Sequence, residues 1–419
     1  MDDGMLHSLW LSLCCRPDSA TFIELIRAFK TPSEVFSASD DAITEVIGTK
    51  NSDLERILLR ETEPARILLD FCHEKKIGLL AFLDPRYPDS LREIEHPPAL
   101  LYYRGVLPDF NHGCYISIVG TRSMSDYGKR NAFRISRDLA ASGATVVSGM
   151  ARGIDAVAAA GAIYAKKPTV AVLGCGINIC YPKEHLTLAR QIVKNGCILT
   201  EYPPNFSPSR YTFPQRNRII SALSQATVVI EGEEKSGSLI TARFAQKQGR
   251  IVYALPGSVD NKNSQGPALL IRNGAKVATC ADDIIRDLEP SNSGILNPFI
   301  LKGNEQYPVD EVLNSLEILY IKVARRRAAL DPSAPIEEPQ APTPIDEEPP
   351  HEPQKIPIGL DGESVSIYQR IPISGDVAIE ELLCEEISDV RKLMKCILKL
   401  EMAKLIKILP GERVSRNIH

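Results

Sequence analysis

Six apolar runs rich in β-forming residues alternate with helix-length segments between Tyr115 and Ala254, and this alternation limits the possible folds most strongly. Continuous apolar strands separated by helices of about 10 to 15 residues are typical of a parallel sheet with helices on both faces. We therefore predict a doubly wound α/β domain. Its strands are expected at residues 115–119, 145–147, 169–173, 198–200, 227–230 and 251–254.

Glycines follow two of the expected helices. The segment 126–142 stops at Gly143, and the segment 183–195 stops at Gly196. Because glycine commonly ends helices by adopting a left-handed conformation, we predict that both glycines are C-caps.

The chain of 419 residues is too long for one hydrophobic core, so several domains are expected. Residues 1–82 have a helical pattern and predict a small helical domain of the helix-hairpin-helix or SAM-like kind. Residues 83–290 contain the sheet. Residues 291–362 combine a helix with a linker that is rich in proline and acidic residues, which we expect to be disordered. Residues 363–419 predict a winged-helix-like domain, with a small helical bundle as the alternative.

Charge is distributed unevenly along the chain. The formal net charge is -4, but residues 111–290 hold 22 Lys and Arg against 13 Asp and Glu. A surplus of basic residues in one domain favours a nucleic-acid partner for that domain.

Nothing in the sequence predicts a membrane span or a signal peptide, and the apolar stretch from Met5 to Cys15 is expected to be a first core helix. The ten cysteines are scattered, which predicts buried free thiols in a reducing, cytoplasmic compartment. A redox or zinc site at Cys175 and Cys180 is the alternative, although metal sites usually have tighter spacing.

Two strand ends carry residues suited to binding phosphate. Gly120, Thr121 and Arg122 follow the first strand, and Ser148 and Gly149 follow the second. Glycine allows close approach of an anion, the next helix offers free N–H groups, and arginine is a bidentate phosphate donor. For the first triplet, a tight turn with a solvated arginine is an equal alternative.

The segment after the fourth strand crowds basic and aromatic residues together. Basic side chains neutralise phosphates while an aromatic ring stacks on an unpaired base, so this composition favours single-stranded nucleic acid. Phe213 could equally be a hydrophobic staple before a helix that starts at Pro214. The candidate binding residues here are Arg210, Phe213, Arg216, Asn217 and Arg218.

Lys235, Ser236 and Gly237 lead into a helix after the fifth strand and again suit a phosphate. Asp155 is expected to cap its helix, with an acid-base role as the alternative, and His185 is expected to be exposed. The sequence contains no Walker A, HExxH or GxSxG motif, and the pair Gly174 and Gly176 is only a fragment of a dinucleotide fingerprint. We therefore predict no catalytic residue, no metal and no cofactor.

Five motifs, IVGTR, SGMARGID, GCGINICYP, FPQRNRII and SGSLITA, resemble in their order and spacing the DNA processing protein A family, also called DprA or Smf. The resemblance implies a Rossmann-like domain and a non-enzymatic recombination mediator. Such a mediator binds single-stranded DNA, forms a dimer and loads the RecA recombinase, as in natural transformation. It also implies that Arg122 and Arg210 contact phosphates and that Phe213 contacts a base, which favours stacking over the staple.

Three other functions are compatible with parts of the pattern. A nucleotide phosphoribohydrolase has a related core, but its PGGxGTxxE motif is replaced here by EGEEKSGSLITA. An NAD-dependent oxidoreductase would need a complete glycine fingerprint. A transcription regulator acting through the C-terminal domain would prefer duplex DNA.

Overall fold

The computed structural model describes residues 3–297 and 307–318 of the chain. Beyond them it describes the short stretches 343–344, 364, 367–368, 371, 376–382, 390–402, 406–409 and 413–416.

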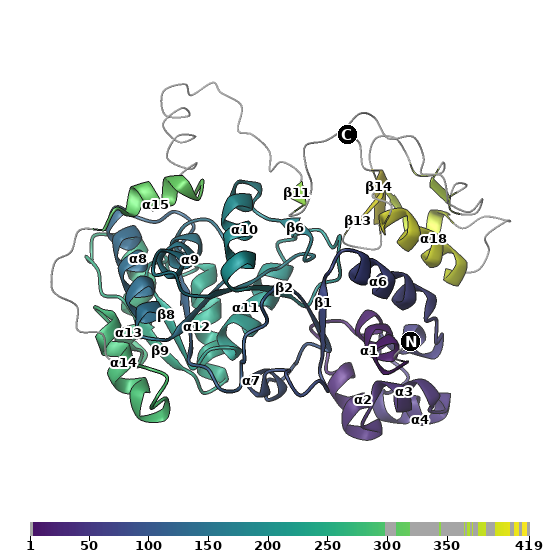
Figure 1. Cartoon of the computed structure of the whole chain (residues 1–419). Helices are drawn as coiled ribbons and strands as arrows, with labels where there is room; N and C mark the ends of the chain where they lie inside the picture. The colour runs from purple at the N-terminus through teal and green to yellow at the C-terminus, as the bar shows by residue number, and fades with distance from the viewer. Residues whose placement is uncertain are drawn as a thin grey trace.

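A nine-stranded sheet occupies the middle of the chain (Figure 1), in the order β1-β2-β7-β5-β4-β3-β8-β9-β10. From β7 to β10 all neighbouring strands are parallel, whereas β1 and β2 are antiparallel to their neighbours. The strands are β1 (Gly78–Ala81), β2 (Leu100–Gly105), β3 (Tyr115–Val119), β4 (Thr145–Ser148), β5 (Thr169–Val172), β7 (Cys197–Thr200), β8 (Ala226–Val229), β9 (Ile251–Ala254) and β10 (Lys276–Val277).

The six predicted strands are all present, each within one residue of its expected bounds, because each is an apolar run buried on both faces. The expectation of helix up to residue 82 is wrong at its end, where Gly78–Ala81 forms β1 and pairs with β2. The sheet is therefore mixed at this edge and parallel elsewhere.

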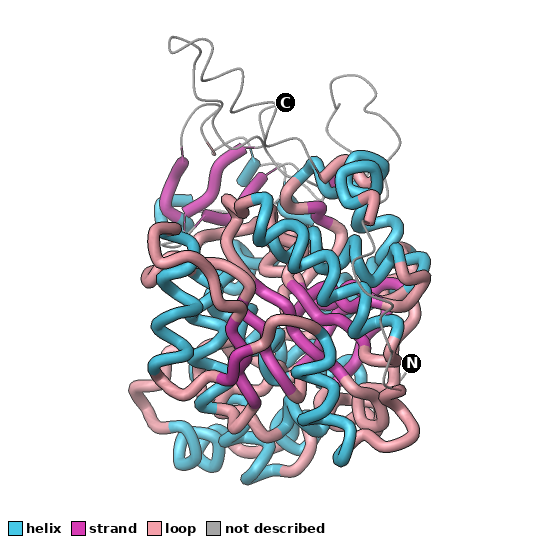
Figure 2. Tube along the Cα trace, turned by 90° about the vertical axis from the view of Figure 1, so that its left-hand side faces the viewer, coloured by secondary structure: helices cyan, strands magenta, loops and turns pink. Residues whose placement is uncertain are grey.

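Helices cover both faces of the sheet (Figure 2). Ser125 begins α8 by accepting a hydrogen bond on its side chain from the Gly128 N–H at 3.1 Å, and Gly143 follows the helix with φ of 103°. Both glycines thus lie where the helices were predicted to end: Gly143 adopts the left-handed conformation, whereas Gly196 is the C-cap of the helix Leu186–Asn195 with an extended backbone, at a φ of -165°. The helices are α8 (Asp126–Ala141), α9 (Ile154–Tyr164), α10 (Leu186–Asn195), α11 (Thr212–Ala222), α12 (Gly237–Lys247), α13 (Gln265–Arg272) and α14 (Ala281–Leu288).

Six helices precede the sheet and lie beside its β1 edge (Figure 1). Their buried side chains belong to the same continuous core as those of the sheet. They are α1 (Asp3–Cys14), α2 (Thr21–Phe29), α3 (Pro32–Ser37), α4 (Asp40–Ile47), α5 (Leu54–Leu58) and α6 (Glu63–Glu74).

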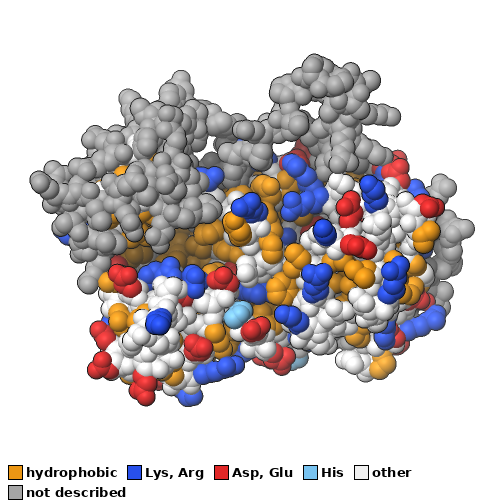
Figure 3. Space-filling model, turned by 180° about the vertical axis from the view of Figure 1, so that it is seen from behind, with side chains coloured by type: hydrophobic (Ala, Val, Ile, Leu, Met, Phe, Trp, Pro, Cys, Tyr) orange, Lys and Arg blue, Asp and Glu red, His pale blue; other side chains and the backbone are white. Residues whose placement is uncertain are grey.

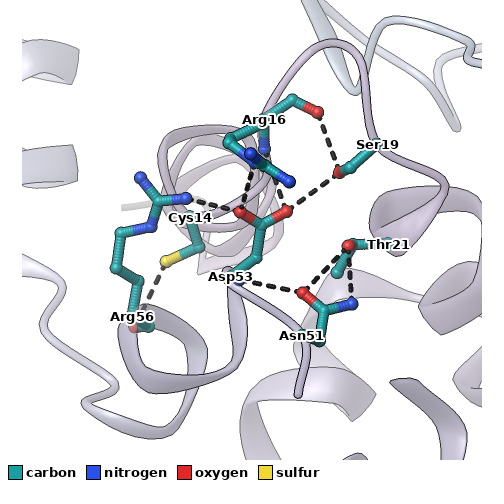
Figure 4. Close-up of polar contacts among 7 residues, drawn as sticks. All are labelled: Cys14, Arg16, Ser19, Thr21, Asn51, Asp53 and Arg56. Atoms are coloured by element: carbon teal, nitrogen blue, oxygen red, sulfur yellow. Dashed lines mark hydrogen bonds and ion pairs between the residues drawn. The ribbon is translucent and has the colours of Figure 1, made fainter. Parts of the chain in front are cut away.

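The fully buried carboxylate of Asp53 ties these helices together (Figure 4). It accepts hydrogen bonds from the Arg16 N–H at 3.2 Å and from the Ser19 hydroxyl at 2.9 Å, and it forms ion pairs with the Arg16 and Arg56 guanidinium groups. Burial raises the pKa of Asp53, but these hydrogen bonds and the Arg56 charge outweigh it and hold the pKa below its usual range.

The C-terminal part contains α18 (Val390–Met402) and a small antiparallel sheet of β12 (Asp376–Ala378), β14 (Arg413–Arg416) and β13 (Ile406–Leu409). Strand β13 pairs antiparallel with β14, and residues 410–412 between them lie outside the described residues. Of the predicted helix and linker at residues 291–362, the structure describes residues 291–297, residues 307–318 with α15 (Val309–Ser315), and β11 (Thr343–Pro344), which pairs with β6 (Ile179–Cys180).

Within the described residues, every helix is too short or too polar to cross a membrane. The nine cysteines described there are free, and all but Cys280 are buried. Burial raises the pKa of the Cys175 and Cys180 thiols to about 12, and no group of described side chains is arranged to hold a metal ion. These observations argue against the alternative of a redox or zinc site at this pair.

Candidate nucleic-acid interface

A groove with a volume of about 690 Å³ lies at the carboxyl ends of β3 and β8. The chain leaves β3 toward β4 on one side and returns through β8 on the other, so this is the point at which the strand order reverses. Open α/β sheets bind ligands at such points. Ten of the thirteen predicted binding residues line the groove: Gly120, Thr121, Arg122, Arg210, Phe213, Arg216, Asn217, Lys235, Ser236 and Gly237.

The loop between β3 and α8 forms one wall. A side chain at Gly120 would place its Cβ 2.6 Å from a carbon of Ile154, so only glycine allows this close approach. The Thr121 N–H donates to the Glu231 carbonyl at 2.7 Å, and the Thr121 carbonyl accepts from the Ile154 N–H at 3.2 Å. The backbone is thereby fixed on both sides, and the exposed Arg122 side chain is held at the groove.

Phe213 provides an aromatic surface in the groove. Its half-buried ring lies 5.4 Å from the Tyr181 ring, centre to centre, and the Arg122 guanidinium lies 5.4 Å from the centre of the Phe213 ring. Helix α11 begins at Thr212, so Phe213 is inside the first turn, whereas a hydrophobic staple requires a residue before the cap. The staple interpretation is therefore wrong, and the ring lines the same groove as Arg122, Arg210 and Lys235, together with the carboxylates of Asp155 and Glu233.

The opposite wall is the start of α12. Ser236 is its N-cap, with the Ser236 hydroxyl accepting from the Ser238 N–H at 3.3 Å. Lys235 precedes the cap and is exposed, as is Arg210. Arg122, Arg210 and Lys235, which come from three separate loops, thus face one groove together with the positive N-terminal end of the α12 dipole. Lys and Arg side chains are also numerous on the face shown in Figure 3, where they lie among apolar ones.

Arg216 lines the floor of the groove but is buried. Its guanidinium donates to the Gly149 carbonyl at 2.8 Å and also to the Val172 carbonyl. Asp155 lies near it, and burial raises the pKa of the Asp155 carboxyl despite the Arg216 charge. Arg216 is therefore placed to add positive potential and to support the loop after β4, where Asp155 also accepts backbone hydrogen bonds.

Three predicted contacts are corrected, because Ser148, Gly149 and Arg218 do not line the groove. The buried Ser148 hydroxyl donates to the Ile118 carbonyl at 2.7 Å, and Gly149 is covered by Arg216. Arg218 is buried, forms an ion pair with Glu201 and donates to the Pro17 carbonyl at 3.0 Å. Arg218 therefore joins α11 to the N-terminal helices.

Other residues that line the groove were not predicted from the sequence, among them Tyr181, Ser209 and Asn263. Tyr181 lies within the motif GCGINICYP, but its contact with Phe213 depends on the packing of two distant loops. The expectation for His185 is wrong: the ring is buried, and its Nδ1 lies 2.9 Å from the Met150 carbonyl. Asp155 lies in the first turn of α9 but is not its cap, which is Gly153.

The fold and the groove define a Rossmann-like α/β protein with a cationic, aromatic-lined site at the point where the strand order reverses. Residues 78–289 match the profile of a family described as DNA recombination-mediator protein A. This chain belongs to that family.

Individual relatives agree with this assignment. The DNA processing protein DprA of Bacillus subtilis (strain 168) is 41% identical over 54% of this chain and 76% of its own length. The Smf protein of Synechocystis sp. (strain PCC 6803) is 38% identical over 67% of this chain and 70% of its own. The X-ray structure of DprA from Streptococcus pneumoniae superposes with a TM-score of 0.59 at 29% identity, covering 68% of this chain and 98% of that one.

Proposed function

We propose that this protein binds single-stranded DNA in the groove and acts as a recombination mediator without catalysing a reaction. The observation that carries the proposal is the convergence of Arg122, Arg210 and Lys235 around the half-buried Phe213 ring. The membership of the chain in a family described as recombination mediators, together with the DNA-processing names of its relatives, supports it.

Each part of the groove suits one part of a nucleotide. The three exposed cations neutralise phosphates, and the positive N-terminal end of α12 attracts another phosphate. Phe213 offers a flat ring on which a base can stack. A base in a duplex is already stacked and paired, so a ring recessed in a groove favours a strand whose bases are free.

We further propose that the bound strand is handed to the RecA recombinase, that the protein acts as a homodimer, and that it does so in the cytoplasm. RecA loading follows from the family's description as a recombination mediator rather than from any contact in the groove. The buried free thiols suit a reducing compartment.

We propose a division of the chain into four parts: a helical domain, a DNA-binding domain, a linker at 291–362 and a winged-helix-like domain at 363–419. The first boundary is best placed before β1 rather than after residue 82, because β1 pairs with β2 and the family match begins at residue 78. The pairing of β13 with β14 beside α18 supports the winged-helix-like part, which has a small core of its own.

Binding of a fluorescent oligonucleotide by Phe213 variants tests the proposal. Loss of a stacked base weakens binding by about 1 to 3 kcal/mol, so Phe213→Ala should bind roughly 5- to 150-fold more weakly. Phe213→Trp should retain most of the affinity because it keeps a stacking surface. Equal affinity of the parent and the alanine variant would refute base contact at this ring.

The mediator role needs a separate assay. The rate of RecA-dependent strand joining should rise when the full-length protein is added, and Arg122→Ala should reduce that effect. An Arg122→Ala variant that binds DNA weakly yet stimulates RecA like the parent would separate the two roles and contradict this part of the proposal.

A further inference from the structure

A second pair of arginine and aromatic side chains lies at the rim of the groove. The Arg210 guanidinium lies 4.8 Å from the centre of the Tyr211 ring, and its Nη2 donates to the Tyr211 hydroxyl at 2.6 Å. Tyr211 nevertheless has 58% of its surface exposed, which is unusual for a large apolar ring in this chain. The cation covers part of the ring and leaves the remainder accessible to solvent.

The pair adjoins the groove. Arg210 lines the groove while Tyr211 does not, so the pair lies across its rim. The backbone here is held in place: the Tyr211 N–H donates to the Ser209 hydroxyl at 3.1 Å, and the Thr212 hydroxyl donates to the Ser209 carbonyl at 2.9 Å. Tyr211 is also the N-cap residue of α11, so its backbone is anchored to the helix that carries Phe213.

The rim pair repeats the composition of the pair inside the groove. There the Arg122 guanidinium lies 5.4 Å from the centre of the Phe213 ring. Each pair joins a bidentate phosphate donor to a flat ring, which are the two groups that a nucleotide of a single strand requires. A guanidinium on one side of a ring also adds to its attraction for a base through cation–π contact.

We propose that Arg210 and Tyr211 form a second nucleotide subsite, in which a base of the strand leaving the groove stacks on Tyr211 and its phosphate contacts Arg210. This inference rests on the proposed function and extends it. The groove holds the first part of the strand, and the rim holds the next nucleotide. Tyr211 therefore contributes only when the DNA is long enough to reach it.

The length of the DNA provides the test. Affinities of the full-length protein are measured for oligothymidylates of about 3 to 15 nucleotides, with the parent, Tyr211→Ala and Tyr211→Phe. Tyr164→Ala is the matched control, because Tyr164 is also an exposed tyrosine, with 41% of its surface accessible. It lies at the last residue of α9, whereas the groove is lined by Asp155 in the first turn of that helix. Thermal unfolding of each variant confirms that it is folded.

We expect Tyr211→Ala to bind the shortest oligonucleotides like the parent and longer ones at least about fivefold more weakly. Tyr211→Phe should keep most of the increase in affinity that longer oligonucleotides give the parent, because it retains the ring and loses only the hydroxyl that Arg210 contacts. This variant distinguishes stacking on the ring from a mere positioning of Arg210 by the hydroxyl.

Three outcomes would overturn the subsite. Tyr211→Ala could match Tyr164→Ala at every length, it could weaken all lengths equally, or Tyr211→Phe could behave like Tyr211→Ala. Failure of the proposed function would look different, since the parent itself would then bind no oligothymidylate of any length.

Discussion

Removal of the Lys235 charge should change the salt dependence of DNA binding by a calculable amount. Three exposed cations line the groove, and each phosphate contact on a single strand contributes about -0.7 to the slope of log K against log salt concentration. Contacts from all three give a slope of about -2, and Lys235→Ala should reduce it to about -1.4. A fourfold rise in salt then weakens the parent about 18-fold and the variant about 7-fold.

Helix α12 supplies the control for this experiment. Lys247 is exposed at the other end of the same 11-residue helix, which is about 16 Å long. That distance exceeds the screening length of about 10 Å at 0.1 M salt, so Lys247→Ala should keep the parent slope. Both substitutions remove one lysine, and the net charge of the chain changes equally.

Fluorescence anisotropy of a labelled oligothymidylate over a salt series measures the slopes directly. If Lys235→Ala and Lys247→Ala show the same slope, the charge at the start of α12 does not contact a phosphate. The reasoning that assigns phosphates to the groove cations would then be refuted.

Further predictions concern the residues that hold the groove and the N-terminal helices in place. Asp53→Asn should lower the free energy of unfolding by about 2 kcal/mol at neutral pH. This difference should vanish as the pH falls through the lowered pKa of Asp53, because the parent carboxylate then becomes protonated. Urea unfolding of the parent and the variant at several pH values measures the difference. Arg218→Ala should lower the free energy of unfolding by about 3 to 5 kcal/mol, because it leaves the buried Glu201 carboxylate unpaired. The double variant Arg218→Met with Glu201→Leu should restore much of the midpoint of urea unfolding. A double variant as unstable as Arg218→Ala would argue against this cause. Gly149→Ala would place a Cβ 2.4 Å from the Arg216 guanidinium, so we expect about 1 to 3 kcal/mol of destabilisation and weaker DNA binding; unchanged thermal unfolding would show that Arg216 can move freely.

The strands of the parallel sheet could be predicted because each one is marked by the composition of its own residues. Each parallel strand is buried on both faces, and an apolar run such as residues 115–119 identifies it without knowledge of its neighbours. The strand β1 was missed because its residues Gly78–Ala81 form a short edge strand that depends on pairing with β2. Gly196 caps its helix as predicted, but the reason for glycine there is different: a Cβ atom would lie 2.1 Å from the Thr169 carbonyl oxygen, so the residue is needed for a close approach rather than for a left-handed turn.

The binding residues could be predicted where they directly follow a strand of the parallel sheet. Arg122 and Lys235 follow β3 and β8, so the topology alone brings them to one edge of the sheet. Arg218 lies only two residues from Arg216 on the same helix, yet it points toward Glu201 and Pro17. Sequence composition does not tell which face of a helix is buried against another domain, and it also did not reveal that His185 is buried.

The affinity for single strands relative to duplex tests the central claim most directly. A labelled oligonucleotide and its duplex are titrated with the parent protein and with Arg122→Ala and Arg210→Glu at one fixed salt concentration. The account predicts that the parent binds the single strand well below the concentration needed for the duplex, and that both variants bind it more weakly, to a similar degree for every sequence. Equal affinity of the parent for duplex and single strand, or variants that bind like the parent, would contradict it.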